Sequence, residues 1–191
     1  LGWAASRLHD RVGGMLFGNP ATGIQHYRPT KDRRALWRLL HDLASSPQEP
    51  GQAEDGLKHI LQHAERSAGT GALIFVVADF NRDINDLDSA LGQLCQRQTV
   101  VLVPIDDRSD HQLPNIGRAL FRGPDDSTIE VNTGSESERL RYHENWQRRR
   151  DELIRLANRL RVSTVPVATD QDVHTALMEG LMRRSRAGVN T

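Results

Sequence analysis

The chain has 191 residues, which is enough for one ordinary domain and short for two. Its 25 basic and 25 acidic residues balance, so net charge offers no reason to expect a nucleic-acid partner or an anionic membrane. No apolar run approaches the roughly 18 to 20 residues that span a bilayer, and the one cysteine, Cys95, cannot form an internal disulfide. We therefore expect a cytoplasmic globular segment in which Cys95 is a small core residue.

The first third of the chain predicts helices that alternate with short strands. A helical opening segment ends at Gly13-Gly14, and residues 15–17 form a short apolar strand that a Gly-Asn-Pro turn closes. An edge strand is expected at residues 24–28. Two amphipathic helices follow, with apolar stripes at Leu36, Leu39, Leu40 and Leu43 in the first and at Leu57, Ile60, Leu61 and Ala64 in the second.

The run ALIFVVADF at residues 72–80 is the strongest strand signal in the chain. A run this apolar is typical of a strand that helices cover on both faces of a parallel sheet. Asp83 is a fair N-cap for the helix that follows, whose stripe is Ile84, Leu87, Leu91, Leu94 and Cys95. With the apolar strand at residues 99–105, these segments predict a parallel, right-handed βαβ unit.

The second half of the chain continues the alternation. A β-hairpin is expected at residues 117–133, and Ser135 and Glu138 have capping-box spacing at the head of a long helix. A last strand is expected at residues 162–167, and Thr169 with Asp172 repeats the capping spacing before a terminal helix. The pattern predicts an α/β fold in three layers, with a mostly parallel sheet flanked by helices.

Polar side chains follow the predicted parallel strands, where ligands of such sheets bind. These residues are Asp79, then Asp106 and Asp107, then Thr169 and Asp170. Carboxylates in one place can hold Mg²⁺, which prefers oxygen ligands. Asp and Thr also cap the helices that follow strands, and we favour this structural role over a metal or catalytic one.

Two further motifs have simpler explanations. His59 and His63 stand one helical turn apart, but the segment lacks the glutamate of zinc-protease helices, so we interpret them as surface residues. The run Arg148-Arg149-Arg150 covers less than one turn and is interpreted as a solvated stretch. No glycine-rich phosphate loop, nucleophile elbow or cysteine-based zinc pattern is present.

Several segments in order and spacing resemble a bacterial family known as domain of unknown function 58, whose fold is similar to the von Willebrand factor A domain. The segments are DRVGGMLFG at 10–18, LIFVVADF at 73–80, TVVLVPIDD at 99–107, LPNIGRALFRGPDDSTIEVNT at 113–133 and TVPVATDQDVHTALMEGLMRR at 164–184. The resemblance implies a single von Willebrand factor A-like domain at residues 1–185, followed by a flexible tail at 186–191.

The resemblance also implies a metal-ion-dependent adhesion site at the top of the sheet. Of its motifs, the chain matches the aspartate after the fourth strand, which is Asp79, and its loop at residues 51–55 carries Glu54 and Asp55 without the expected threonine. The DxSxS strand of this site would lie before Leu1. We therefore expect no cofactor in this segment and at most weak metal binding. The sequence leaves open whether the complete parent protein binds Mg²⁺ or carries an upstream membrane anchor.

A sheet without that central strand would leave backbone groups unpaired, which is costly. We expect either that the neighbouring strands close up or that a second copy pairs with the exposed edge as a homodimer.

The function that we expect is non-enzymatic. The resemblance implies a protein-interaction module that acts with a MoxR-type AAA+ ATPase in protein assembly or remodelling, through a surface around Asp79, Asp106, Glu54 and Asp55. The alternative is a metal-dependent hydrolase or phosphotransferase with Asp79 and Asp106 as ligands and a metal-bound water as nucleophile.

Overall fold

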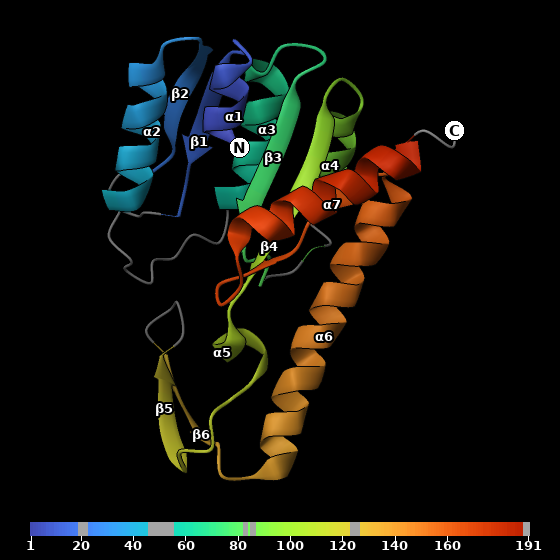
Figure 1. Cartoon of the computed structure of the whole chain (residues 1–191). Coiled ribbons are helices and arrows are strands. Elements are labelled where there is room, and N and C mark those ends of the chain that lie inside the picture. Colours follow the sequence, from blue (N-terminus) through green and yellow to red (C-terminus); the bar gives the residue numbers. More distant parts are fainter. Residues whose placement is uncertain (19–22, 46–55, 82–83, 85–86, 123–126, 189–191) are drawn as a thin grey trace. The chain divides into compact units, whose positions relative to one another are not determined.

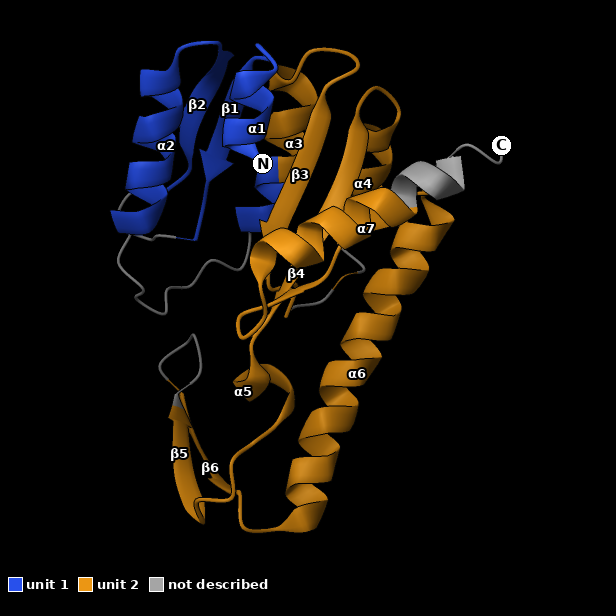
Figure 2. Cartoon of the chain, in the orientation of Figure 1, with its two compact units in different colours: residues 1–60, 124–126 blue, residues 61–123, 127–191 orange. Residues whose placement is uncertain are grey.

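The computed structural model describes residues 1–18, 23–45, 56–81, 84, 87–122 and 127–188, with the backbone alone for residues 122 and 184–188. The chain divides into two compact units (Figure 2). Unit 1 contains residues 1–60 and 124–126, and unit 2 contains residues 61–123 and 127–191. The single domain at residues 1–185 stays a prediction.

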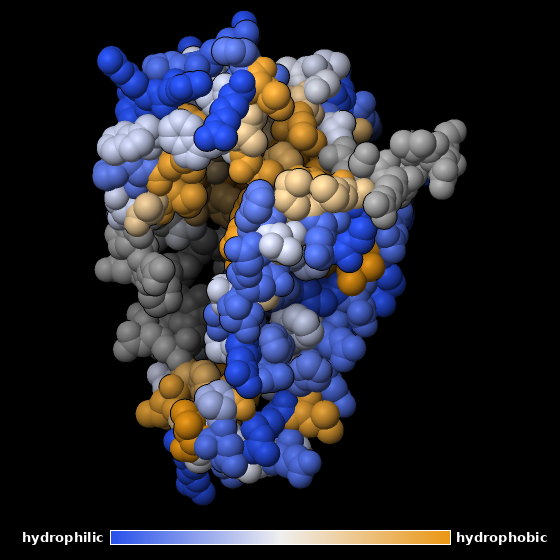
Figure 3. All heavy atoms as spheres, viewed as in Figure 1, coloured by the Kyte–Doolittle hydropathy of each residue, from blue (hydrophilic) through white to orange (hydrophobic). Residues whose placement is uncertain are grey.

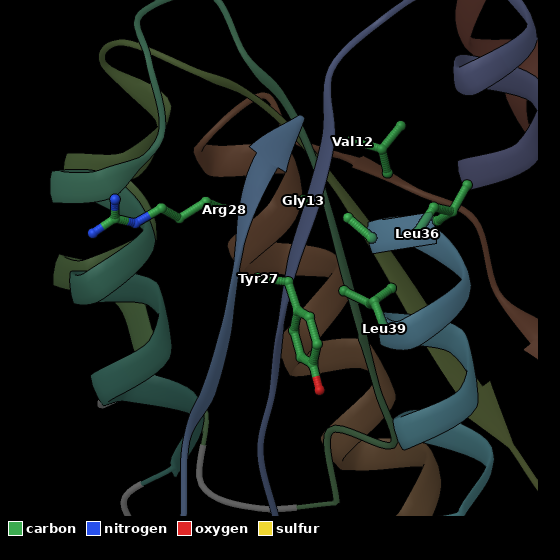
Figure 4. A pocket seen from close by; sticks show the side chains of 7 residues that line it. Val12, Gly13, Tyr27, Arg28, Leu36 and Leu39 are labelled. Atoms are coloured by element: carbon green, nitrogen blue, oxygen red, sulfur yellow. The ribbon is translucent and has the colours of Figure 1, made fainter. Parts of the chain in front are cut away.

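Unit 1 is an antiparallel strand pair with helices packed against it. Its elements are α1 (Gly2–Arg7), β1 (Val12–Leu16), β2 (Gln25–Thr30) and α2 (Arg33–Ser45), and α3 (Gly56–Ser67) begins in unit 1 and continues in unit 2 (Figure 1). Figure 4 shows Leu36 and Leu39 of α2 directed toward the strand pair, while Arg28 of β2 points away from them. Of the apolar stripes predicted for these two helices, Leu36 in α2 and Leu57, Ile60 and Leu61 in α3 are confirmed as buried core residues.

The strand β1 begins earlier than the sequence predicted, because Gly13 and Gly14 lie inside it instead of ending a helix. A Cβ atom on Gly13 would lie 2.6 Å from the carbonyl oxygen of Tyr27 and 2.7 Å from the nitrogen of Pro29, both in β2. A Cβ atom on Gly14 would collide with Leu39. The two glycines therefore let β1 pack closely against β2 and against α2. The sequence pattern alone predicts them only as the end of a helix.

Unit 2 contains the parallel sheet, a hairpin and the long helix. Its elements in chain order are β3 (Leu73–Ala78), α4 (Leu87–Cys95), β4 (Thr99–Asp106), α5 (Arg108–His111), β5 (Arg118–Arg122), β6 (Thr128–Asn132), α6 (Glu136–Arg159), β7 (Ser163–Thr164), β8 (Val167–Ala168) and α7 (Val173–Gly188) (Figure 1).

The parallel sheet confirms the α/β fold class. β3 pairs with β4 in continuous parallel register from Leu73 opposite Thr99 to Ala78 opposite Pro104, and β7 and β8 pair with the other edge of β4. A buried cluster of valines on β4 and the strands after α6 packs against α7, and it contains Val101, Val103, Val165 and Val167. Figure 1 shows α4 on the opposite face, so helices flank the sheet on both sides.

Two local predictions at the sheet and helix ends change, and a third is confirmed. The last strand is divided in two, β7 and β8, and Pro166 between them lacks a backbone donor. Ser135 precedes α6, but its hydroxyl contacts the Ser137 hydroxyl and makes no cap hydrogen bond. The hairpin is confirmed, while its turn, like the proposed N-cap Asp83, lies outside the described residues.

The outer edge of β3 is open. Within the described residues, β3 is hydrogen-bonded to β4 alone, and β1 and β2 form a separate sheet, so the expected closing-up of neighbouring strands is wrong for this part of the chain. Leu73 and Val77 on β3 are 53% and 49% exposed. Pairing of this edge with a second copy stays a prediction.

Two further findings concern membrane-spanning helices and the C-terminal helix. In the part of the chain that the structure describes, no helix is long and apolar enough to cross a membrane. The helix α7 ends at Gly188, so residues 186–188 of the predicted tail are helical.

Candidate functional site

The carboxyl ends of β3 and β4 bring the predicted acidic residues to one edge of the sheet. The two strands are parallel and in register, so Asp79 follows β3 at the same edge at which Asp106 ends β4. Thr169 follows β8, and its backbone N–H donates to the carbonyl oxygen of Asp106 over 2.9 Å. This edge is the place where ligands of parallel sheets bind, and we take it as the candidate site.

Asp106 is engaged by an arginine of the long helix α6. The Nε atom of Arg150 donates to Asp106 Oδ1 over 2.8 Å, and its Nη2 atom contacts the same oxygen and the carbonyl oxygen of Ile105. The two side chains are 11% and 16% exposed. A carboxylate this buried and already paired is a poor ligand for a cation, because the cation would leave Arg150 buried without a partner.

Asp107 is engaged by hydroxyl and backbone groups. Its Oδ1 accepts hydrogen bonds from the Ser109 backbone N–H over 2.9 Å and from the Ser109 hydroxyl over 2.5 Å, and Oδ2 accepts from the Thr169 hydroxyl over 2.5 Å. Asp110 completes a capping box at the start of α5. The Ser109 and Thr169 hydroxyls favour the charged form, which lowers the pKa of Asp107 from 3.8 to about 2.

Thr169 therefore has a different role from the predicted one. We expected Thr169 and Asp172 to cap the terminal helix together, but Asp172 caps alone, with its Oδ1 accepting from the Thr175 backbone N–H over 2.7 Å. The Thr169 hydroxyl joins β8 to the loop after β4 instead. The structural role that we favoured for these polar residues fits Asp107 and Asp172, since both carboxylates hold the first turn of a helix.

Asp79 is an exposed carboxylate at the end of β3. Its Oδ1 accepts a 3.2 Å hydrogen bond from the backbone N–H of Asn81. The next residue, Phe80, has a left-handed backbone with φ of +53° and a side chain that is 1% exposed. A left-handed residue other than glycine costs roughly 1–2 kcal/mol, which burial of the phenyl ring offsets. The turn thus places Phe80 in the core and leaves Asp79 on the surface.

These donors do not fit a Mg²⁺ site. Mg²⁺ takes several oxygen ligands in near-octahedral geometry, whereas Asp106 pairs with Arg150 and Asp107 accepts from Ser109 and Thr169. Across residues 1–18, 23–45 and the other described ranges, no group of three or more His, Cys, Asp or Glu side chains is arranged to hold a metal ion. Glu54 and Asp55, the other predicted site residues, lie outside the described residues.

The arginine run on α6 is not uniformly solvated, which corrects our interpretation of it. Arg148 is exposed and donates to Asn145 over 3.1 Å, while Arg150 points to the end of β4. The guanidinium carbon of Arg150 also lies 5.8 Å from the centre of the Trp146 ring, within cation–π range. The spacing of Trp146 and Arg150, one helical turn apart, was a signal that these two side chains share a face.

A group of aromatic rings that sequence reasoning missed fixes α5 against α6. The ring of His111 lies 5.0 Å from that of Trp146, and the His143 ring lies 5.9 Å from Trp146. The Tyr142 hydroxyl donates to the Ser109 carbonyl oxygen over 3.1 Å, and His143 Nδ1 is 3.0 Å from the carbonyl oxygen of His111. No periodicity in the sequence links these positions, because the contacts join residues more than 30 positions apart.

Comparisons with known proteins identify a family but no activity. The family model described as "Protein of unknown function DUF58" matches residues 1–152. The chain is similar to the crystal structure of conserved hypothetical protein BatB from Bacteroides thetaiotaomicron, with a TM-score of 0.51 and 14% identity over 98% of this chain and 86% of that chain. No curated protein matches the chain. At this identity the likeness to BatB shows the fold alone.

Replacement of Arg150 by alanine tests the ion pair. The variant leaves the Asp106 carboxylate nearly buried without its partner, and we expect it to lose about 3 kcal/mol of unfolding free energy. Arg148→Ala removes an exposed arginine of the same helix and should change stability by less than about 0.5 kcal/mol. Urea denaturation of both variants measures the difference, and equal losses would contradict the assigned role of Arg150.

The hydrogen bonds of Asp107 predict a contribution to stability that depends on pH. Because the pKa of Asp107 is lower in the folded chain, this contribution is complete above pH 4 and is lost as the pH falls toward 2. Asp107→Asn keeps a cap but removes the charge, so it should be less stable than the parent chain at pH 5, with the difference shrinking between pH 4 and 2.

Two measurements check this expectation. Urea midpoints at each pH give the stability difference, and Asp151→Asn provides the control for loss of an exposed carboxylate elsewhere. The ¹³C chemical shift of the Asp107 carboxyl group follows its titration directly. A midpoint near 4 in that titration would show that the hydroxyl contacts do not stabilise the charged form.

Proposed function

Because the chain belongs to the DUF58 family, whose function is unknown, its role is inferred from its own residues, and we propose that it is a non-enzymatic protein-interaction module. The candidate site favours this proposal over catalysis, since Asp106 is engaged in an ion pair and Asp107 in a helix cap. A surface for another protein needs no activated nucleophile or bound metal.

The observation that carries the proposal is the open edge of β3. The carbonyl oxygen of Ala72 accepts from the backbone N–H of Thr99 over 2.9 Å, so the backbone groups of Leu73, Phe75 and Val77 point away from β4 by strand alternation. Exposed strand edges pair with extended segments of other chains, and alternate side chains supply specificity. The half-exposed Leu73 and Val77 offer such apolar contacts.

The partner that we propose is a MoxR-type AAA+ ATPase, with which the chain would act in protein assembly or remodelling in the cytoplasm. The family resemblance motivates this choice, and the contact surface would comprise the β3 edge and the loops around Asp79, with Glu54 and Asp55. Asp106 would act indirectly, by holding Arg150 of α6. A second copy on the β3 edge is the alternative occupant, which would give a homodimer.

A metal-dependent hydrolase or phosphotransferase is the alternative function. One observation favours it, since the exposed Asp79 precedes a left-handed Phe80, and such strained backbone occurs at functional sites. Against it, Asp106 would have to exchange Arg150 for a cation. Asp170 after β8 is a second exposed carboxylate, but across the described residues no group of three or more metal-ligating side chains comes together.

Binding of the full chain to a MoxR-type ATPase from the same genome tests the proposal. We expect Asp79→Ala to weaken the affinity about tenfold, because it removes a surface contact, while Glu144→Ala, an exposed carboxylate on α6, changes it less than twofold. Surface plasmon resonance with the ATPase immobilised measures both. Absence of binding, or an equal effect of the two variants, would contradict the proposed partner and surface.

The open edge has a matched test in the same assay. Val77→Lys places a charge beside the edge, which discourages strand addition, and it should weaken ATPase binding about tenfold. Leu140→Lys makes the same change at an exposed apolar position of α6 that is 56% exposed, and it should leave binding unchanged. If Val77→Lys binds normally, β3 is not the contact strand.

A further inference from the structure

The outward face of α2 has a composition that the fold does not require. Leu36 and Leu39 occupy the inner side of α2, against the strand pair (Figure 4). At 100° per residue, the opposite side of the helix carries Arg34, Trp37, Arg38 and His41, all of them exposed. We call these four residues the α2 outer face.

Trp37 is the unusual member of the α2 outer face. Its side chain is 56% exposed, although tryptophan is highly buried on average in folded proteins. Its ring stacks on His41 with 4.8 Å between the ring centres and 8° between the planes. The stack covers part of the indole ring and leaves more than half of the Trp37 side chain exposed.

Asp32 and Asp42 lie close to the α2 outer face in sequence, but in the part of the chain that the structure describes neither forms an ion pair with its arginines. Across the described residues, Lys31, Arg34 and Arg38 make no ion pair. Asp32 lies at the start of the helix, where its Oδ1 accepts from the Arg34 backbone N–H over 2.9 Å. Asp42, toward the inner side, accepts from the Tyr27 hydroxyl. Arg34 and Arg38 thus lie on the same side of α2 as Trp37.

The balanced charge of the whole chain hides this local excess. Residues 1–45 contain seven Lys or Arg residues and three Asp residues, whereas the complete chain has 25 of each sign. Overall neutrality removes long-range attraction to polyanions, but it does not remove short-range pairing at one helix face. The relevant ligand is therefore small and acidic rather than a long polyanion.

We propose that the α2 outer face binds an acidic peptide segment of a protein partner. Carboxylates of the segment pair with Arg34 and Arg38, which can each bind a carboxylate through two N–H groups, and an apolar side chain packs on Trp37. Tryptophan and arginine are the residues that most often dominate binding at protein interfaces. The inference rests on the proposed interaction function and specifies the chemistry of its partner.

The size of the α2 outer face favours a peptide over a nucleic acid. From Arg34 to His41 the helix rises about 10 Å, a length that a few extended peptide residues cover. Proteins that bind DNA through its backbone make about 6 to 10 phosphate contacts, more than the cations of this face supply.

Fluorescence anisotropy with a short fluorescein-labelled peptide of glutamate and leucine tests the inference on the full chain. We expect saturable binding that weakens with added salt and is lost for the same peptide with glutamine in place of glutamate. Arg34→Glu with Arg38→Glu should weaken binding at least about tenfold, and Trp37→Ala about fivefold. Circular dichroism of each variant checks that it is folded, and Arg34→Gln with Arg38→Gln offers a milder change of the same two residues.

A matched pair of exposed arginines on α6 provides the control. Arg148→Glu with Arg155→Glu changes the net charge by the same amount and should alter the affinity less than twofold. Equal weakening by both pairs, or no binding by the parent chain, would overturn the inference. Preference for duplex DNA or for phosphatidylglycerol vesicles over the peptide would overturn it in favour of those ligands.

The test separates this inference from the proposed function. Loss of peptide binding in Arg34→Glu with Arg38→Glu, combined with normal ATPase binding, would support the α2 outer face as a second docking surface. If the chain binds the ATPase but does not bind the acidic peptide, the inference about α2 is overturned and the proposed partner is not. If the chain binds the acidic peptide but does not bind the ATPase, the proposed partner is overturned and the inference about α2 is not.

Discussion

The ion pair between Arg150 and Asp106 decides what the carboxyl end of this sheet can do. It joins the middle of α6 to the last residue of β4, and both side chains are nearly buried. Pairs of this kind add little net stability compared with apolar residues, but the loss of one partner is costly. Because Asp106 is paired with Arg150, its carboxylate is not available to bind a cation. The same pair fixes α6 next to the end of β4, just before the helix α5 that Asp107 caps.

The sequence predicted the regular parts of the fold, since those depend on local patterns. The strands β3 and β4 and the helix between them were found from unbroken apolar runs and helical stripes. Gly13 and Gly14 were misassigned because their role depends on Tyr27 and Leu39, which are distant in sequence. A local pattern cannot report which segment packs against a glycine.

The candidate site was predictable in position but not in chemistry. Asp79 and Asp106 were expected at the strand ends, and the structure puts them there. What separates them is the environment, because Asp106 meets Arg150 from 44 positions away while Asp79 stays exposed. The sequence contains both partners of each contact, but only the packing of α6 against β4 selects Arg150 over its exposed neighbour Arg148.

Two exposed surfaces are consistent with a chain that works by contact with other proteins. Among the described residues, the edge of β3 combines unpaired backbone groups with half-exposed Leu73 and Val77. The α2 outer face combines two exposed arginines with an exposed tryptophan. One surface suits an extended apolar strand and the other an acidic segment. The two lie in different compact units, so each can be changed without altering the other.

Calorimetric titration of Mg²⁺ into the full chain tests most directly whether the strand ends are structural rather than catalytic. The account predicts no saturable heat at millimolar Mg²⁺, because the ion needs several oxygen ligands and no group of three or more metal-ligating side chains forms among the described residues. Tight binding that disappears in Asp79→Ala would contradict the account and favour a metal-dependent enzyme.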